Sequence, residues 1–384
     1  MLESILVYSI LFTIMIFCCI SVAGKEEKYV GWSGEYQEGT RFMSLEMIIL
    51  MLSFAFVFGC RWGVGRDYFR YLYAYTGDIP ERFEYLFRTI SDVLKRFGVH
   101  YSVYFGIWAL MDVFMLYYAA RNFKFIFPYI AFFLIFGFYY LSMMNAIRQH
   151  IAAFFFMISI TYIDQKKILK YYLCFFIAVL FHRLSLILFV FYPLLRLKDD
   201  WFKSISLQLI LYVLAVIISF NSELVTEWIE IPFEWLSEKI GYQRYQYDLL
   251  TDERFDRNKF GSGTGLGIWV NMFKTIPIIL LSQKMKDYYN SSFINMLYTL
   301  FFLGVLLSLL FGDSIILNRI TYFFVDFQII IYSLFVYFCF DTKNPVYQVV
   351  GAMLLLIQIP LFINVLNNPN STAQYLFFWQ RYMY

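Results

Sequence analysis

The chain has 384 residues, of which 61% are hydrophobic and only 15% are charged. Soluble proteins carry roughly 45–50% apolar and about 25% charged residues, so a soluble enzyme of this size could not bury so much apolar surface. This composition and a net charge of +3 also exclude a disordered chain and a nucleic-acid-binding domain. We therefore predict an all-α polytopic integral membrane protein with about 11 to 12 transmembrane helices.

Uncharged apolar runs mark the expected spans, beginning with residues 4–23. This first run is too long for a signal-peptide core, so we interpret it as a span that is kept. Further spans are expected near 43–60, 101–120, 125–143, 149–163, 204–221, 266–283, 291–312, 315–338 and 346–366. The five cysteines lie in or beside such runs without a CxxC pair, which favours packing over a disulfide framework.

Residues 171–195 form an apolar run that is too long for one span and too short for two. His182 and Arg183 interrupt it near the centre, where an arginine facing lipid would cost about 2.5–3.5 kcal/mol on insertion scales. Two short or re-entrant helices would avoid this cost by placing the pair at a tip that faces a polar cavity. We predict this arrangement, with one long helix as the alternative.

Two long loops complete a single predicted membrane domain, 1–384. Residues 61–100 carry apolar side chains at helical spacing, which predicts an amphipathic helix on the membrane surface. Residues 222–265 are expected to form a large external cap. With 171–195 split, most lysines fall in loops on one side and most arginines on the other. The positive-inside rule then makes the lysine side cytoplasmic and both long loops extracytoplasmic.

The first polar motif follows the second span and reads Arg61-Trp-Gly63-Val-Gly65-Arg-Asp67-Tyr68-Phe-Arg-Tyr71. Its two glycines let the backbone bend close to a ligand at the membrane boundary. Arg61 can reach from the end of the span into a cavity, and a guanidinium suits phosphate or carboxylate. The alternative is an interfacial turn with a snorkelling arginine.

Three shorter polar motifs lie between apolar segments, namely Asn145-Ala-Ile-Arg148-Gln149, His182-Arg-Leu-Ser185 and Asn318-Arg319-Ile-Thr-Tyr322. Arg148 needs an anionic partner, which is either a ligand or an acid such as Asp112 or Asp326. His182 could transfer protons near neutral pH, or could cap a broken helix. Arg319 could join the other arginines around one anion, or could pair with Asp313.

The sequence gives no sign of a metal or a cofactor, and we expect neither. Its three histidines are scattered and no HExxH motif occurs. The glycine-rich stretch 261–267 follows no predicted strand and precedes no Lys-Ser or Lys-Thr pair, which favours a flexible hinge over a nucleotide loop. Nucleophilic catalysis is poorly supported too, because no GxSxG motif is present.

The order and spacing of these motifs resemble the EpsG family, the Wzy-like exopolysaccharide and capsule polymerases. The resemblance covers residues 1–340 and rests on RxGxGxDYxxY at 61–71, NxxRQ at 145–149, HxxS at 182–185 and a late RxxY element. This late element, Arg319 to Tyr322, departs from a strict RxxxY pattern because Phe323 occupies the last position.

The resemblance implies a glycosyltransferase of the cell's inner (cytoplasmic) membrane, with the GT-C-like helical plan shared by O-antigen ligases and an active site on the extracytoplasmic side. Its donor and acceptor would be undecaprenyl-pyrophosphate-linked oligosaccharides, joined with inversion. Arg61, Arg148 and Arg319 would stabilise the pyrophosphate leaving group without a metal. His182 is the first candidate for the general base and Asp67 the second. Sugar-binding or supporting roles are expected for Gly63, Gly65, Tyr68, Tyr71, Asn145, Gln149, Ser185 and Tyr322.

Two other functions stay open from the sequence. One is a flippase or transporter of the same lipid-linked sugar, and the other is a ligase or acyltransferase that modifies a surface glycan. Membrane lipid and the lipid-linked oligosaccharide are the expected partners, a chain-length regulator is a further candidate, and nucleic acid is not expected. The motifs specify neither the sugars, the linkage nor the oligomeric state.

Overall fold

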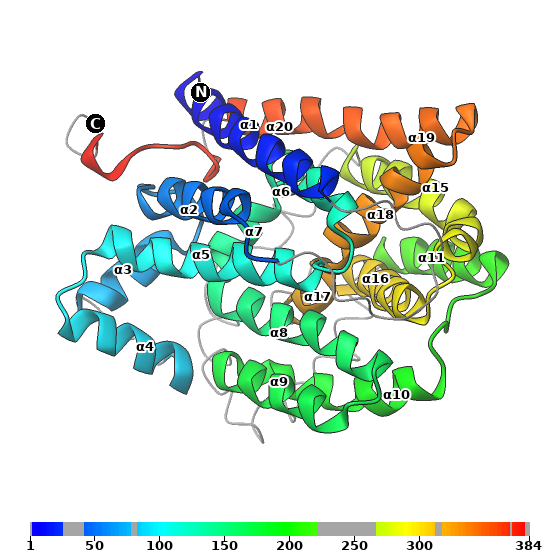
Figure 1. Ribbon diagram of the computed structural model, residues 1–384, viewed down its shortest axis with the longest axis horizontal. Coiled ribbons are helices and arrows are strands. Elements are labelled where there is room, and N and C mark those ends of the chain that lie inside the picture. Colours follow the sequence, from blue (N-terminus) through cyan, green and yellow to red (C-terminus); the bar gives the residue numbers. More distant parts are fainter. Residues whose placement is uncertain are drawn as a thin grey trace. The chain divides into compact units, whose positions relative to one another are not determined.

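The computed structural model describes residues 2–25, 42–77, 83–220, 266–311, 317–368 and 371–380, most of which are helical (Figure 1). Within these ranges the only β-structure is one isolated bridge. The chain divides into two compact units, Met1–His182 with Ile329–Tyr384 and Arg183–Gln328. The all-α polytopic membrane fold is confirmed, whereas the organisation as one membrane domain stays a prediction.

Five helices of the described part of the chain are long and apolar enough to cross a membrane. They are Leu2–Gly24, Tyr101–Ala119, Ser292–Phe311, Asn318–Asp341 and Pro345–Asn367. The pair Lys124–Phe136 and Tyr139–Asn145, bent by 65°, would add a sixth span if it crosses as one unit. Three more apolar helices are shorter, so the larger expected number of spans stays a prediction.

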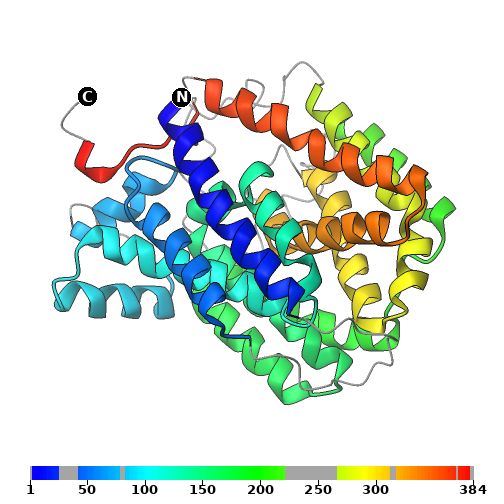
Figure 2. The same cartoon turned by 45° about the horizontal axis from the view of Figure 1, so that its top comes forward.

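The first unit contains most of the helices. In chain order they are α1 (Leu2–Gly24), α2 (Leu45–Gly59), α3 (Tyr68–Thr76), α4 (Tyr85–Arg96), α5 (Tyr101–Ala119), η1 (Lys124–Ile126), α6 (Phe127–Phe136), α7 (Tyr139–Asn145), α8 (Ile147–Asp164), α9 (Ile168–Phe181), α18 (Phe327–Asp341), α19 (Pro345–Leu356), α20 (Gln358–Asn367) and η5 (Phe378–Gln380). Helix α2 packs against both α1 and α5 (Figures 1 and 2). A Cβ on Gly59 would lie 2.7 Å from the carbonyl oxygen of Ser102, so the lack of a side chain permits the close approach of α2 and α5.

Helix α4 is the amphipathic element of the 61–100 loop. Phe87 and Ser91 are buried on one side, and most of the other side chains are exposed. The ring of Phe87 stacks on Trp108 of α5 with centroids 4.4 Å apart, and the hydroxyls of Ser91 and Tyr104 lie 3.2 Å apart. The apolar face of α4 therefore packs on α5, while its place on the membrane surface stays a prediction.

The run 171–195 is interrupted at His182, as predicted. Helix α9 ends at Phe181, and His182 adopts an extended conformation with φ −153° and ψ 116°. A 3₁₀ segment, η2 (Arg183–Val190), and a short helix, α10 (Phe191–Leu197), follow. The boundary between the two units falls between His182 and Arg183, so the two sides of the break belong to different units.

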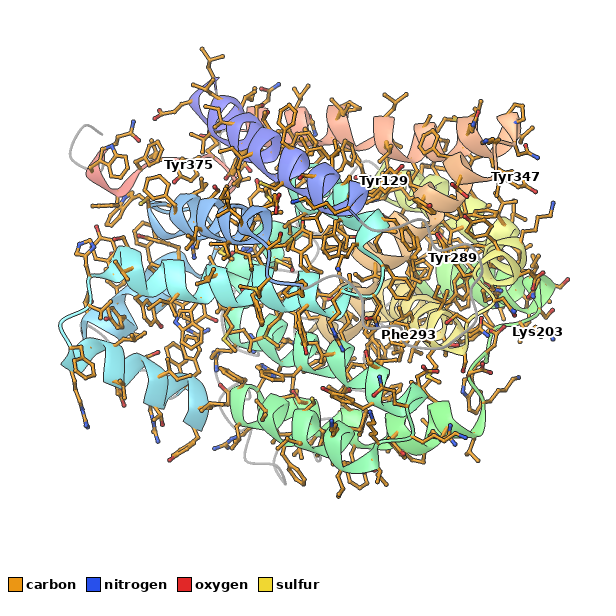
Figure 3. All side chains as sticks on the ribbon, in the orientation of Figure 1. Tyr129, Lys203, Tyr289, Phe293, Tyr347 and Tyr375 are labelled. Carbon is orange, nitrogen blue, oxygen red and sulfur yellow. The ribbon has the colours of Figure 1, made fainter. Side chains whose placement is uncertain are left out.

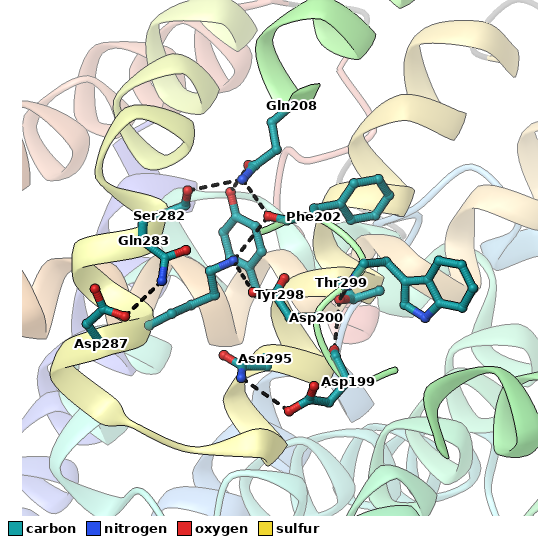
Figure 4. A network of polar contacts seen from close by, with 12 residues as sticks. Asp199, Asp200, Phe202, Gln208, Ser282, Gln283, Asp287, Asn295, Tyr298 and Thr299 are labelled. Carbon is teal, nitrogen blue, oxygen red and sulfur yellow. Dashed lines mark hydrogen bonds and ion pairs between the residues drawn. The ribbon is translucent and has the colours of Figure 1, made fainter. Parts of the chain in front are cut away.

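The second unit continues from η2 and α10 through α11 (Ile205–Ser219), α15 (Leu266–Tyr289), α16 (Ser292–Phe311) and α17 (Asn318–Val325). A polar network joins its helices (Figure 4). The Lys286 ammonium donates to Asp200 Oδ2 over 2.7 Å, and Gln208 accepts from the Tyr298 hydroxyl over 2.5 Å and donates to Ser282 over 3.2 Å. The predicted cap 222–265 and most of the glycine-rich stretch lie outside the described residues.

Candidate functional site

Arg61 stands just beyond the end of α2 and is completely buried. Its Nε donates to the carbonyl oxygen of Val64 over 3.2 Å, and its Nη1 donates to the carbonyl oxygen of Phe58. Its Nη2 is buried without a hydrogen-bond partner among the described residues. The side chain therefore points into the protein, and the alternative of a snorkelling arginine is wrong.

Aromatic rings surround the Arg61 guanidinium. Its central carbon lies 4.6 Å from the ring centre of Phe105 and 5.5 Å from that of Tyr68. Burial lowers the pKa of Arg61 to about 10. Electrostatic interaction with Tyr68, Tyr375, Tyr8 and, least, Asp112 opposes this shift. Arg61 thus stays charged at neutral pH in a setting of low dielectric constant, where attraction to an anion is strong.

The backbone after Arg61 forms a tight loop, as its two glycines predict. Gly63 has φ +69° and Gly65 has φ +99°, which are conformations that favour glycine. The side-chain oxygen of Asn145, at the end of α7, accepts a hydrogen bond of 2.5 Å from the amide of Arg66. The structure therefore brings the first and second sequence motifs into direct contact.

Helix α3 begins directly after this loop and presents the two motif tyrosines inward. Asp67 precedes it as a half-buried N-cap residue, without a side-chain capping bond. Tyr68 is buried and stacks on Phe105 with centroids 4.8 Å apart. Burial raises the pKa of the Tyr71 hydroxyl, and the positive charge of Arg148 opposes that rise. Tyr71 therefore stays protonated close to the second arginine.

Arg148 lies in the first turn of α8 and forms an ion pair with Glu84. The two side chains are only 13% and 8% exposed, so this is a nearly buried pair. The guanidinium also lies 4.6 Å from the ring centre of Phe83. Glu84 was not among the residues predicted from the sequence. The available signal was an acid that follows Phe83 and precedes Phe87 by three positions, at the start of the amphipathic helix.

A row of rings on α5 and α4 links the two arginine environments. Phe105, beside Arg61, lies 5.4 Å from Tyr104, which lies 6.1 Å from Trp108. Trp108 stacks on Phe87, whose ring centre is 5.9 Å from the Arg148 guanidinium. The two arginines are thus separate, one at each end of an aromatic row.

His182 lies close to this row. The residue before it, Phe181, makes an edge contact with Trp108 at 6.3 Å. His182 is buried, and its amide donates to the carbonyl oxygen of Ala178 over 2.8 Å. It ends α9, as the capping alternative expects, and its role as a base stays a prediction. Gln149 is buried in the first turn of α8, next to Arg148.

Three predicted residues belong to the second unit. Ser185 is buried in η2, while Arg319 and Tyr322 are half-buried on α17. Their spacing of three residues puts Arg319 and Tyr322 on one side of that helix. Asp313, the predicted alternative partner of Arg319, lies outside the described residues. Nowhere in the described part of the chain do three His, Cys, Asp or Glu side chains gather as metal ligands would.

The segment 371–380 pairs with the Arg61 loop and was not predicted from the sequence. The isolated β-bridge joins Arg61 to Phe377, and the amide of Trp62 donates to the carbonyl oxygen of Leu376 over 2.7 Å. Tyr375 is buried against the end of α2. No motif marks this segment, so the sequence carried no local signal of the contact.

Comparison with known proteins agrees with the motif pattern. A family model described as the EpsG family matches residues 45–380, which include all four motifs and the segment beside Arg61. Searches of the curated proteins and of the solved structures gave no match. Because the family model covers most of the sequence, the chain belongs to the EpsG family.

Proposed function

We propose that this protein is a polysaccharide polymerase that joins undecaprenyl-pyrophosphate-linked oligosaccharide units on the outer face of the cytoplasmic membrane. The EpsG family is associated with exopolysaccharide biosynthesis. The observation that carries the proposal is Arg61, a buried cation with one terminal nitrogen unpartnered among the described residues, held in a glycine-rich loop at a helix end. Such a group is suited to an anionic head group.

The proposed reaction is a single displacement at the anomeric carbon of the donor. An acceptor hydroxyl forms the new glycosidic bond while the bond to the lipid pyrophosphate breaks, which inverts the configuration. The hydroxyl proton passes to His182 or Asp67, and the electron pair leaves with the pyrophosphate. Arg61, Arg148 and Arg319 stabilise the negative charge that develops on this leaving group.

The two arginines of the first unit enter this reaction differently. Nη2 of Arg61 is the atom that would bind a phosphate oxygen while Nε and Nη1 keep their main-chain partners, and because it is buried the side chains that cover it must move to admit the ligand. Arg148 is paired with Glu84, so a phosphate must share this guanidinium with a carboxylate or displace it. We therefore expect Arg61 to contribute more than Arg148 to stabilising the leaving group, because part of the Arg148 charge is already neutralised by Glu84.

Substitution of each arginine tests the proposal. Arg61→Ala and Arg148→Ala should each lower chain extension by about 10²–10³-fold, the usual loss when a stabilising donor is removed. Arg121→Ala is the matched control, because Arg121 also bonds a main-chain carbonyl and lies 4.1 Å from a tyrosine ring, beyond the far end of α5. The assay follows polymer length on gels, with purified protein in liposomes and a lipid-linked oligosaccharide.

The outcomes separate the candidate functions. Wild-type polymer length from both arginine variants would contradict the proposed roles. Transport of labelled lipid-linked sugar without new glycosidic bonds would indicate a flippase, and a single transfer to a different acceptor would indicate a ligase or an acyltransferase. The pH dependence of chain extension tests the base. If His182 takes the proton, the rise in rate near neutral pH should disappear in His182→Ala and persist in Asp67→Asn.

A further inference from the structure

Residues 371–380 run back from the end of α20 to the loop that carries Arg61, far away in sequence. Three main-chain hydrogen bonds join them, from the Trp62 amide to Leu376 (2.7 Å), from the Gly65 amide to Thr372 (2.8 Å) and from the Phe378 amide to Cys60 (2.9 Å). The loop therefore takes part of its hydrogen bonding from this segment, which we call the strap.

The strap is also fixed to the first two helices. The amide of Tyr375 donates to the hydroxyl of Ser4 over 2.8 Å, and the hydroxyl of Tyr8 donates to the carbonyl oxygen of Ala373 over 2.8 Å. The Tyr375 hydroxyl donates to the carbonyl oxygen of Val57 over 2.6 Å. Figure 3 shows Tyr375 beside α2. These bonds anchor the strap independently of the loop.

Tyr375 and Arg61 together complete the C-terminal end of α2. The last four carbonyl groups of a helix have no donor within the helix. Here Val57 receives the Tyr375 hydroxyl, and Phe58 receives Nη1 of Arg61. One side chain from the strap and one from the loop thus bind neighbouring carbonyls, which places the guanidinium next to the strap.

The strap bonds also set the direction of the carbonyl that holds Arg61. Val64, whose oxygen accepts from Nε of Arg61 over 3.2 Å, lies between the two strap-bonded amides of Trp62 and Gly65. We propose that the strap 371–380 positions the Arg61 guanidinium for its anionic substrate, with Tyr375 as the positioning residue. The consequence for catalysis rests on the proposed function, while docking of the strap does not.

Cys60 supplies a reporter of strap docking that is independent of activity. It is half-buried, whereas Cys18, Cys19, Cys174 and Cys339 are buried. The carbonyl oxygen of Cys60 accepts from the Phe378 amide of the strap over 2.9 Å, and the Tyr375 hydroxyl bonds Val57, three residues before Cys60, so the strap lies against this residue. Release of the strap should therefore expose Cys60. Alkylation by N-ethylmaleimide, mapped by mass spectrometry, measures that exposure in the full chain.

Two pairs of variants test the strap. Tyr375→Ala removes the anchor to Val57, and its control Gln374→Ala removes only bonds to Leu366 and Asn368, near the end of α20. Phe378→Pro removes the amide donor to Cys60 at the first position of η5, where proline is tolerated, and Phe378→Ala keeps that donor.

We expect Tyr375→Ala and Phe378→Pro to label Cys60 about tenfold faster than the wild type, as local opening would. Chain extension should fall by about 10²-fold, mainly in kcat, because Arg61 loses its geometry. Tyr375→Phe should lie between the wild type and Tyr375→Ala, and Gln374→Ala should resemble the wild type. Phe378→Ala loses the ring contacts to His100 and Tyr101, so Phe378→Pro should exceed Phe378→Ala in labelling rate by the effect of the amide donor. Rapid labelling of Cys174 and Cys339 would identify an unfolded variant. In that case the Cys60 labelling rate and chain extension of the milder Tyr375→Phe variant test the proposal.

The strap proposal is overturned if Cys60 labels at the wild-type rate in both Tyr375→Ala and Phe378→Pro. It is also overturned if Cys60 labels rapidly while chain extension stays at the wild-type rate. Absence of polymer from the wild-type protein would instead reject the polymerase, and the labelling rates would still decide whether the strap docks. The two proposals therefore fail in different measurements.

Discussion

The buried pair of Arg148 and Glu84 makes a prediction about stability that can be worked out from its geometry. With side chains 13% and 8% exposed, loss of one partner leaves the other charge nearly buried without this counter-charge. Such a loss costs about 3–5 kcal/mol when nothing replaces the partner. Glu84→Gln keeps an acceptor oxygen of similar shape, so its cost should approach the value of one charged hydrogen bond, about 1.5–3 kcal/mol.

A double-mutant cycle isolates the pair from other contacts. Arg148→Gln also loses the attraction of the guanidinium to the Phe83 ring, worth about 0.5–1 kcal/mol, whereas Glu84→Gln keeps it. The double variant has two neutral amides that can bond to each other. We therefore expect a coupling energy of about 2 kcal/mol, within the range for residues in contact.

The assay is equilibrium unfolding in mixed micelles, followed by tryptophan fluorescence. A matched cycle of Arg148→Gln with Glu46→Gln is the control, because Glu46 forms an ion pair with Lys25. That cycle should be additive within about 0.5 kcal/mol. A coupling of this small size between Arg148 and Glu84 would refute the pair, and with it the argument that a phosphate must compete with Glu84.

Two further changes test local packing. Gly65→Ala should lower the free energy of unfolding by at least about 1 kcal/mol more than Gly98→Ala, because both glycines have positive φ but only Gly65→Ala would place a Cβ 2.8 Å from the Asn145 oxygen. Equal unfolding free energies would show that the Asn145 side chain moves away without cost. Tyr298→Phe should destabilise the second unit by about 1–3 kcal/mol, because Gln208 loses a buried donor. A change below about 0.5 kcal/mol in that unfolding measurement would contradict the network.

Features that depend on neighbouring residues were readable from the sequence. The apolar runs predicted a helical membrane protein, and the pair His182-Arg183 predicted the break that the structure places at His182. The glycines of the first motif predicted a tight loop, and both have positive φ. Each of these features follows from local hydropathy or local backbone freedom, which a sequence displays directly.

Contacts between distant segments were not readable. Glu84 meets Arg148, 64 positions later, and the strap meets a loop more than 300 positions earlier. Neither contact follows from spacing in the sequence. Any of several acids could have paired with Arg148, and the main-chain hydrogen bonds of the strap do not require particular residue types. The inward direction of Arg61 likewise depends on carbonyls and rings supplied by the fold.

The sequence by itself determined a helical membrane protein of the EpsG family, together with the residue types of the candidate site. Tertiary structure alone decided which charges are paired, which arginine nitrogen stays unpartnered among the described residues, and which segment shapes the loop. The physical reason is that hydropathy and glycine content act over a few residues, whereas ion pairing and main-chain bonding between segments depend on where packing brings them.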